Sequence, residues 1–216
     1  MRRIPVDQLK PGMIVAKAIY NSDGGVLLRS GVKLTDIFIN RLSTLAIPSV
    51  YIKDSLFDDS KYQDVISEET RIATIRAVKE SFNNLEQARR LNISMVQSLV
   101  DNILDELLEN PNVLINLSDI RLFDDYTFAH SVNVCVLALL TAIILGYDKY
   151  KLKELGIGAL LHDVGKTRID KEILNKPDDL TKDEFEEIKR HTEYGFEILR
   201  QYPDVSLLAA HIALQH

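Results

Sequence analysis

The sequence predicts a mainly α-helical protein in which an all-helical domain follows a small α/β module. Two observations carry this prediction. Apolar residues recur at helical spacing over most of the chain after residue 67, whereas residues 1–56 hold short apolar runs separated by turn signals. The patterns divide the chain into a small α/β N-terminal module (1–56), a helical connector (57–112) and a helical domain (113–216).

The N-terminal module is predicted from strand and turn patterns. Residues 13–20 are typical of a strand, the turn signal Asn-Ser-Asp-Gly-Gly follows, and residues 26–28 return as a second strand. Thr35 can cap a helix over residues 36–45, and another strand is expected at 49–52. The module has no cluster of histidines, cysteines or paired carboxylates, so no chemistry is predicted in it.

Two amphipathic helices are predicted in the connector, over residues 68–91 and 94–108, and Asn110-Pro111 stops the second. Their apolar residues recur at the spacing of one helix face. The first interpretation is a packed helical connector. The alternative is a helix pair that forms a homodimer.

Helices account for the rest of the chain. A nearly all-apolar helix is expected over residues 126–145, and another over 149–162. The capping-box pattern Thr181-Lys182-Asp183-Glu184 predicts one helix that continues through His191 to about residue 201. Pro203 breaks that helix, and a last one is expected to begin at residue 205.

Composition limits the partners. The 216 residues are 46% hydrophobic and 27% charged, which is typical of a soluble globular protein. The net charge of −6 gives no general attraction to DNA, RNA or an anionic membrane. A single cysteine, Cys135, excludes an internal disulfide, and the longest apolar run is too short for a membrane span. With no apolar signal segment after Arg2 and Arg3, a cytoplasmic protein is expected.

The segment from Leu160 to Lys166 holds the pattern with most chemical content. An apolar helical run ends there in His162-Asp163, followed by Gly165 and Lys166. A carboxylate can bridge two cations while imidazoles bind each of them. Gly165 is expected to let the backbone turn sharply, and Lys166 can place an ammonium group beside a phosphate. Taken alone, the pair is better explained by an ordinary helix end with an incidental histidine and aspartate.

Three further histidines favour a metal site. His130 lies near the start of the most apolar helix, where an unpaired imidazole is costly to bury, although a hydrogen-bonded structural role is the alternative. His191 and His216 also lie on predicted helices, and a solvated surface position is the alternative for His191. Imidazoles with one carboxylate suit Fe, Mn, Zn or Ni better than Mg or Ca. His211 is five positions before His216, faces elsewhere and is expected outside the centre.

In this order the motifs resemble those of the HD-GYP family, within the HD superfamily of metal-dependent phosphohydrolases, which hydrolyses the bacterial messenger cyclic di-GMP. The resemblance covers residues 119–216. The motifs that carry it are His130-Ser131-Val132-Asn133-Val134, His162-Asp163-Val164-Gly165-Lys166, Ile173-Leu174-Asn175-Lys176-Pro177, Leu180-Thr181, Glu184-Phe185 and His191-Thr192-Glu193-Tyr194-Gly195. The Leu9-Lys10-Pro11-Gly12-Met13 start of the N-terminal module is similar to that of modules found ahead of such domains.

The resemblance implies a two-metal phosphodiesterase with an HD-type fold. It makes His162, Asp163, His191 and His216 metal ligands, with Asp163 bridging, and His130 matches an upstream histidine that binds metal in some members. The implied cofactors are two divalent transition-metal ions, Fe or Mn ahead of Zn or Ni, and the implied substrate is a cyclic dinucleotide. Asp163 and Lys166 are the implied catalytic residues, with Lys166 stabilising charge on the phosphoryl oxygens.

Two departures from the family pattern matter. Members with a third metal carry a glutamate where this chain has Tyr126, which argues against a third ion. The family pattern also continues past His216, with a second histidine, an aspartate ligand and the Gly-Tyr-Pro loop. We therefore expect weak metal binding and little activity from these 216 residues alone. The alternatives to a cyclic di-GMP phosphodiesterase are a non-catalytic HD scaffold that binds nucleotide or partner proteins, and an HD phosphohydrolase acting on another nucleotide.

Overall fold

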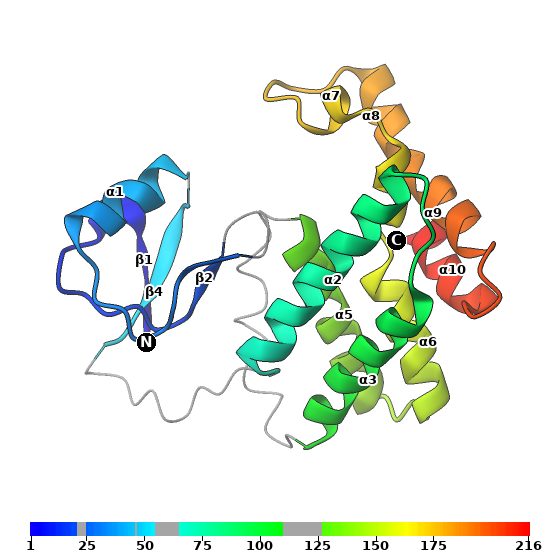
Figure 1. The fold of residues 1–216 in the computed structure, drawn as a ribbon, viewed down its shortest axis with the longest axis horizontal. Coiled ribbons are helices and arrows are strands. Elements are labelled where there is room, and N and C mark those ends of the chain that lie inside the picture. The colour runs from blue at the N-terminus through cyan, green and yellow to red at the C-terminus, as the bar shows by residue number, and fades with distance from the viewer. Residues whose placement is uncertain (21–24, 46, 55–64, 110–126) are drawn as a thin grey trace. The chain divides into compact units, whose positions relative to one another are not determined.

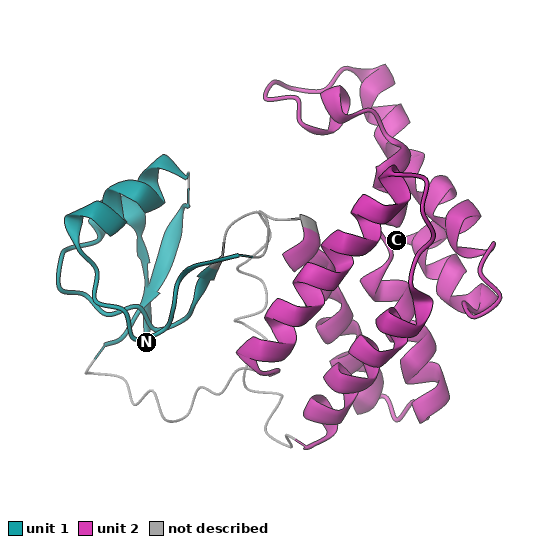
Figure 2. Ribbon diagram, in the orientation of Figure 1, with its two compact units in different colours: residues 1–64 teal, residues 65–216 magenta. Residues whose placement is uncertain are grey.

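The computed structural model describes residues 1–20, 25–45, 47–54, 65–109 and 127–216. The chain forms two compact units, Met1–Asp64 and Val65–His216 (Figure 2). The first unit is a small α/β module and the second is helical throughout its described part (Figure 1). The predicted fold class is therefore confirmed.

The first unit is built from two short antiparallel strand pairs and one helix. Strand β1 (Arg2–Pro5) pairs with β4 (Ser49–Ile52), and β2 (Ile19–Tyr20) pairs with β3 (Val26–Leu28). The strand predicted over residues 13–20 is mostly irregular: only isolated bridges at Ile14 and Val15 precede β2. The helix α1 (Asp36–Thr44) begins, as expected, at Thr35, whose hydroxyl accepts from the Phe38 N–H. Of the turn predicted at residues 21–25, residues 21–24 lie outside the described residues.

The second unit packs its helices around one apolar core. No helix in the described part of the chain is long and apolar enough to cross a membrane. Its elements, in chain order, are α2 (Glu68–Glu86), α3 (Ile93–Glu109), α5 (Thr127–Ile144), α6 (Lys149–Leu160), the 3-10 helix η4 (Val164–Arg168), α7 (Lys171–Leu174), α8 (Lys182–Lys189), α9 (His191–Leu199) and α10 (Leu207–Gln215).

The two helices predicted as a connector contribute to the core of this unit. Val78 and Phe82 of α2 and Val100 and Ile103 of α3 are buried in the same cluster as the apolar face of α5. Burying such side chains stabilises the unit by about 1.5–3 kcal/mol each. The apolar faces of α2 and α3 are thus used inside the unit, and a homodimer through this region stays a prediction.

The helix predicted from Thr181 to about residue 201 is wrong as a single element. The capping box at Thr181 and Glu184 is present, but α8 ends at Lys189 and α9 begins at His191. At the junction the Arg190 N–H bonds to the carbonyls of Glu187 and Ile188, so the regular α-helical ladder is interrupted there. His191 consequently lies at the start of a helix and not in the middle of one.

The helix α10 lies close against α6 because Gly158 has no side chain. A Cβ atom at Gly158 would lie 2.8 Å from the backbone oxygen of Ala209 and 2.5 Å from the Cδ1 atom of Ile212. Ser206 caps α10, its hydroxyl accepting from the Ala209 N–H. This close packing positions His216, at the end of α10, over the segment that follows α6.

Candidate metal centre

His162 and Asp163 lie in the turn between α6 and η4, as predicted for a helix end. The α-helix stops at Leu160, and the Lys166 N–H bonds to the Asp163 carbonyl within the 3-10 turn that follows. Both side chains are almost fully buried, with 4% and 3% of their surface exposed. Burial of this carboxylate requires partners, and the surrounding histidines and Lys166 provide them.

Gly165 is needed for a different reason from the one expected. Its backbone does not adopt the left-handed conformation that a sharp turn would require. Instead, a Cβ atom at this position would lie 1.9 Å from the His191 carbonyl oxygen and 2.5 Å from the Gly195 nitrogen. The absent side chain allows η4 and α9 to make backbone contact, which brings His191 next to Asp163.

Three histidines are held in the same way. The Nδ1 atom of each lies within hydrogen-bond distance of the backbone carbonyl three residues earlier: His162 at 2.8 Å from Ala159, His216 at 2.9 Å from Ala213, and His191 at 2.5 Å from Ile188. A carbonyl oxygen can only accept, so Nδ1 carries the hydrogen in each ring. In the neutral imidazoles, Nε2 therefore presents a lone pair, which is the form that binds a metal.

These Nε2 atoms converge on Asp163. His162 Nε2 lies 3.4 Å from Oδ2, and the Nε2 atoms of His191 and His216 each lie 3.5 Å from Oδ1. The ring centroids of His162 and His216 are 4.7 Å apart, and those of His191 and His216 are 4.9 Å apart. The two carboxylate oxygens therefore face different sets of imidazoles.

The arrangement fits a bound cation. The Nε2 atoms of His191 and His216 are 2.9 Å apart, and with both Nδ1 atoms protonated two lone pairs face each other across this distance. Two ligands about 2.1 Å from a metal ion, at a right angle, lie about 3.0 Å apart, close to this distance. A proton shared between the rings is the other way to relieve the repulsion, but neighbouring imidazoles disfavour one another's charged forms.

The charge states of the centre agree with this fit. Burial raises the pKa of Asp163, but the neighbouring His162 and His216 side chains and the positive charge of Lys166 outweigh it and hold that pKa well below its usual range. Burial lowers the pKa of His191. At neutral pH the centre thus contains a carboxylate and, at His191, a neutral imidazole, and both are forms that metals bind.

His130 extends the centre on the other side of His162. Their ring centroids lie 5.3 Å apart. The potential ligand atoms form two groups, His130, His162 and Asp163, and Asp163, His191 and His216, with all atoms of a group within 4.8 Å of one another. Asp163 belongs to both. All five predicted ligands are therefore brought together, while Tyr126 lies outside the described residues.

Lys166 lies at the edge of the centre. Its Nζ atom is 2.7 Å from Asp163 Oδ2, and 30% of its side chain is exposed. The side chain thus contacts the carboxylate and is partly exposed to solvent. Lys166 can therefore meet a substrate that approaches from solvent.

Sequence reasoning missed the groups that orient the imidazoles. The backbone carbonyls of Ala159, Ile188 and Ala213 fix the three rings, and a side-chain motif does not encode a carbonyl. For Gly195 the sequence did contain a signal, because this residue closes the motif that begins at His191. In the structure Gly195 packs against Gly165. His211 behaves as expected: it contacts Phe196, with ring centroids 5.0 Å apart, and joins neither ligand group.

Known proteins resemble the chain both in sequence and in fold. The HD domain family matches residues 127–216. The cyclic di-GMP phosphodiesterase PA4108 of Pseudomonas aeruginosa is 30% identical over an alignment that covers all of this chain and 59% of that protein. A cyclic di-GMP phosphodiesterase of Thermotoga maritima is 40% identical over 52% of this chain and 30% of its own length.

A solved structure shares the fold. Bd1817, an HDG"Y"P protein from Bdellovibrio bacteriovorus, superposes with a TM-score of 0.58 at 20% identity, covering all of this chain and 76% of that protein. The chain spans less than two thirds of the length of both phosphodiesterases. Residues 127–216 thus match the HD domain family, in line with the resemblance of the chain's motifs to those of the HD-GYP family.

Proposed function

We propose that this protein is a phosphodiesterase that hydrolyses cyclic di-GMP with two divalent transition-metal ions. One observation supports the proposal most: three imidazole Nε2 atoms converge on the two oxygens of a single buried carboxylate. A structural histidine cluster needs hydrogen-bond partners for its nitrogens, whereas the contacts of these Nε2 atoms with other described residues are to one another and to Asp163.

The ligands divide into two sides around Asp163. His130 and His162 would hold one ion together with Asp163, and His191 and His216 would hold the other. Asp163 would be shared, because Oδ1 faces His191 and His216 whereas Oδ2 faces His162. Imidazole-rich ligand sets of this kind favour Fe, Mn, Zn or Ni over Mg or Ca.

The chemistry follows from charge placement. Bound ions would supply Lewis acidity and lower the pKa of a nearby water, so that a nucleophile is available at neutral pH. Lys166 would leave Asp163 once the carboxylate is engaged in coordination, and its ammonium group would donate to a phosphoryl oxygen.

The substrate class is inferred from the relatives. Both phosphodiesterases described above are named for cyclic di-GMP, and the one from Pseudomonas aligns with the whole chain. The alternative is a scaffold that binds nucleotide without cleaving it. The retained Lys166, paired with Asp163 and reachable from solvent, favours the enzyme.

Replacing Asp163 tests the proposal. In the full-length protein, Asp163→Ala should abolish cyclic di-GMP hydrolysis and lower the bound metal content, with an unchanged circular dichroism spectrum. His211→Ala is the matched control, since His211 is half-buried in the same helix as His216 but belongs to neither ligand group. Unchanged turnover in the Asp163 variant would refute the mechanism, and cyclic di-GMP binding without cleavage by the unaltered protein would establish the scaffold instead.

A further inference from the structure

A second hollow lies at the opposite end of η4 from Asp163. It is a pocket of about 270 Å³ formed where the last turn of α2, the end of η4 and the end of α9 meet. Thr167 and Arg168 line it from η4, and Gln201 and Tyr202 from the segment after α9. None of its lining residues belongs to the metal centre.

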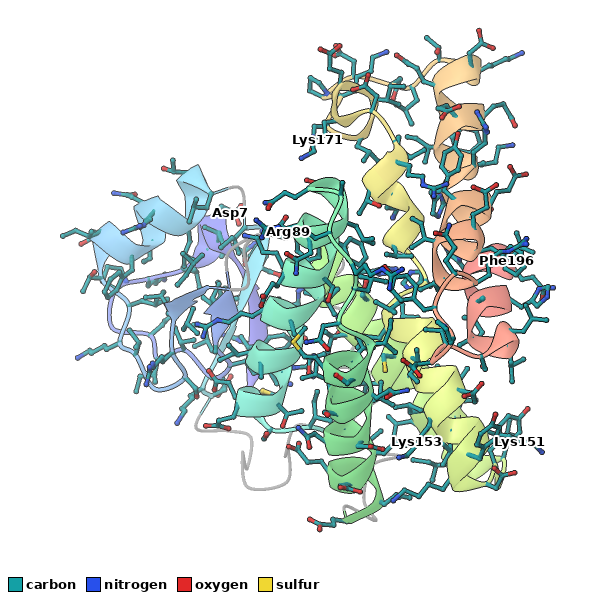
Figure 3. All side chains as sticks on the ribbon, turned by 45° about the vertical axis from the view of Figure 1, so that its right-hand side comes forward. Asp7, Arg89, Lys151, Lys153, Lys171 and Phe196 are labelled. Atoms are coloured by element: carbon teal, nitrogen blue, oxygen red, sulfur yellow. The ribbon has the colours of Figure 1, made fainter. Side chains whose placement is uncertain are left out.

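Three arginines give this pocket its charge. Arg89, Arg90 and Arg168 line it, and no carboxylate does. Among the described residues, no acidic side chain pairs with Arg89 or Arg90, whereas Arg168 Nη1 is 2.7 Å from the Glu197 carboxylate. Figure 3 labels Arg89 at the end of α2. Two unpaired guanidinium groups beside a third form a site for an anion.

The backbone that presents two of these arginines is strained. Ala88 has φ of 56°, a left-handed conformation that costs a residue with a side chain about 1–2 kcal/mol. The chain reverses there: the Ala88 N–H bonds to the Leu85 carbonyl and the Arg89 N–H to the Asn84 carbonyl. Glycine is the usual residue at such a helix end. The turn nevertheless brings Arg89 and Arg90 to the pocket, and strain of this kind is characteristic of functional sites.

The remaining walls suit an organic group. Leu85 and Ile198 provide apolar surface. The Tyr202 ring is fixed because its hydroxyl accepts from the Leu91 N–H at 3.0 Å. Gln201 donates from Nε2 to the Glu197 carbonyl, which leaves its Oε1 atom as an acceptor. The pocket thus combines anion-binding cations with an apolar and aromatic surface, as small-molecule sites do.

We propose that this pocket is a second ligand site, which binds a phosphate monoester of the size of a nucleoside monophosphate. Arginine forks match phosphate oxygens, and the apolar wall accommodates the organic part. The volume of about 270 Å³ lies just below the roughly 300–1,000 Å³ range of drug-sized ligand pockets, so the pocket suits a small ligand and is too small for a whole cyclic dinucleotide. This site goes beyond the proposed phosphodiesterase activity and does not depend on it.

Calorimetric titration of the metal-free chain tests the proposal. The chain is first dialysed against a chelator, so that the metal centre cannot hold phosphate. The probes are GMP, guanosine and inorganic phosphate. GMP should bind at least tenfold more tightly than either of the others, and chemical-shift changes on GMP addition should centre on the amides of Thr167 and Gln201.

Two variants decide where the ligand binds. The double variant Arg89→Ala/Arg90→Ala should weaken GMP binding at least tenfold. Arg76→Ala, which removes an exposed arginine from α2, the helix that precedes Arg89 and Arg90, should leave it unchanged. Equal affinity for GMP and guanosine, equal affinity for GMP and phosphate, or undiminished binding by the double variant would overturn the proposal. Because no activity or metal is measured, a failure here is distinct from a failure of the phosphodiesterase.

Discussion

The two ends of η4 differ in charge although only a few residues separate them. At one end, Asp163 is buried among imidazoles whose Nε2 atoms present lone pairs, an environment that favours a cation. At the other end, Arg168 joins Arg89 and Arg90 around a pocket that favours an anion. At about 2 Å per residue in a 3-10 helix, Asp163 and Arg168 are about 10 Å apart along the axis.

The contrast shows how one short element can serve two kinds of chemistry. The side chains that define each end come from different parts of the chain: α9 and α10 complete the cation end, and the turn after α2 completes the anion end. What both ends share is the backbone of η4, which Gly165 anchors against α9. Substitutions should therefore affect one end, the other or both, depending on where they lie.

The largest effect is expected at the shared anchor. Gly165→Ala places a Cβ atom against the His191 carbonyl, which cannot move without α9, so the unfolding free energy should fall by about 3 kcal/mol or more. Both metal binding and GMP binding should weaken. Urea unfolding followed by far-ultraviolet circular dichroism measures the stability.

Gly146→Ala is the control for this prediction. Gly146 has φ of 74° and open space where a Cβ atom would lie, so the cost should be only about 1–2 kcal/mol from the left-handed backbone. Both ligands should bind normally. If the two glycine variants lose the same stability, the anchoring role of Gly165 is wrong.

The second-largest effect should be confined to one end of η4, because it should change metal binding and leave GMP binding unchanged. His191→Ala removes a ligand from the cation end, and the affinity for a divalent metal such as Mn²⁺ should drop about 100-fold or more, since even changes around a ligand cost 10–100-fold. Affinity for GMP should stay the same. His211→Ala should change neither. Parallel calorimetric titrations measure both affinities, and a loss of GMP binding in the His191 variant would show that the ends are not separate.

A smaller effect of opposite sign is expected at the strained turn. Ala88→Gly removes a left-handed penalty of about 1–2 kcal/mol and adds a glycine entropy cost of about 0.5–1 kcal/mol, so the protein should be more stable by about 0.5–1 kcal/mol. Ala73→Gly, on the exposed face of α2, should instead destabilise by about 1 kcal/mol. If the urea midpoints of the Ala88→Gly and Ala73→Gly variants shift in the same direction, the strain assigned to Ala88 is contradicted.

The smallest effect is expected away from both ends, at the α8 capping box. Hydrogen bonds from Lys176 and the Thr181 N–H lower the pKa of Glu184 from its ordinary 4.5 to about 2. Its contribution to stability is therefore fully present above pH 4.5 and is lost as the pH falls toward 2. The stability difference between the unaltered protein and Glu184→Gln should shrink over this window. A difference that is constant with pH would show that Glu184 acts without its charge.

Helix starts could be predicted from the sequence because their signals are local. Thr35, Thr181 and Ser206 each accept from a backbone N–H within three residues, so neighbouring residues contain the whole signal. The break between α8 and α9 could not be predicted in this way. The residue at the junction is Arg190, which is not a helix-breaking residue such as proline or glycine. The contact that fixes the position of α9 is made with Gly165, 25 residues earlier in the chain.

By itself the sequence predicted which residues lie together around Asp163, since the order of His130, His162, Asp163, His191 and His216 resembles a family pattern. It also determined the fold class, through periodicity and caps. Only the tertiary structure decided which imidazole nitrogen faces the carboxylate, because backbone carbonyls fix the rings.

The tertiary structure alone also decided that three arginines share a pocket. Arg89 and Arg168 are 79 residues apart, and no local pattern encodes a contact across that separation. The meeting of α2, η4 and α9 depends on the packing of a whole core.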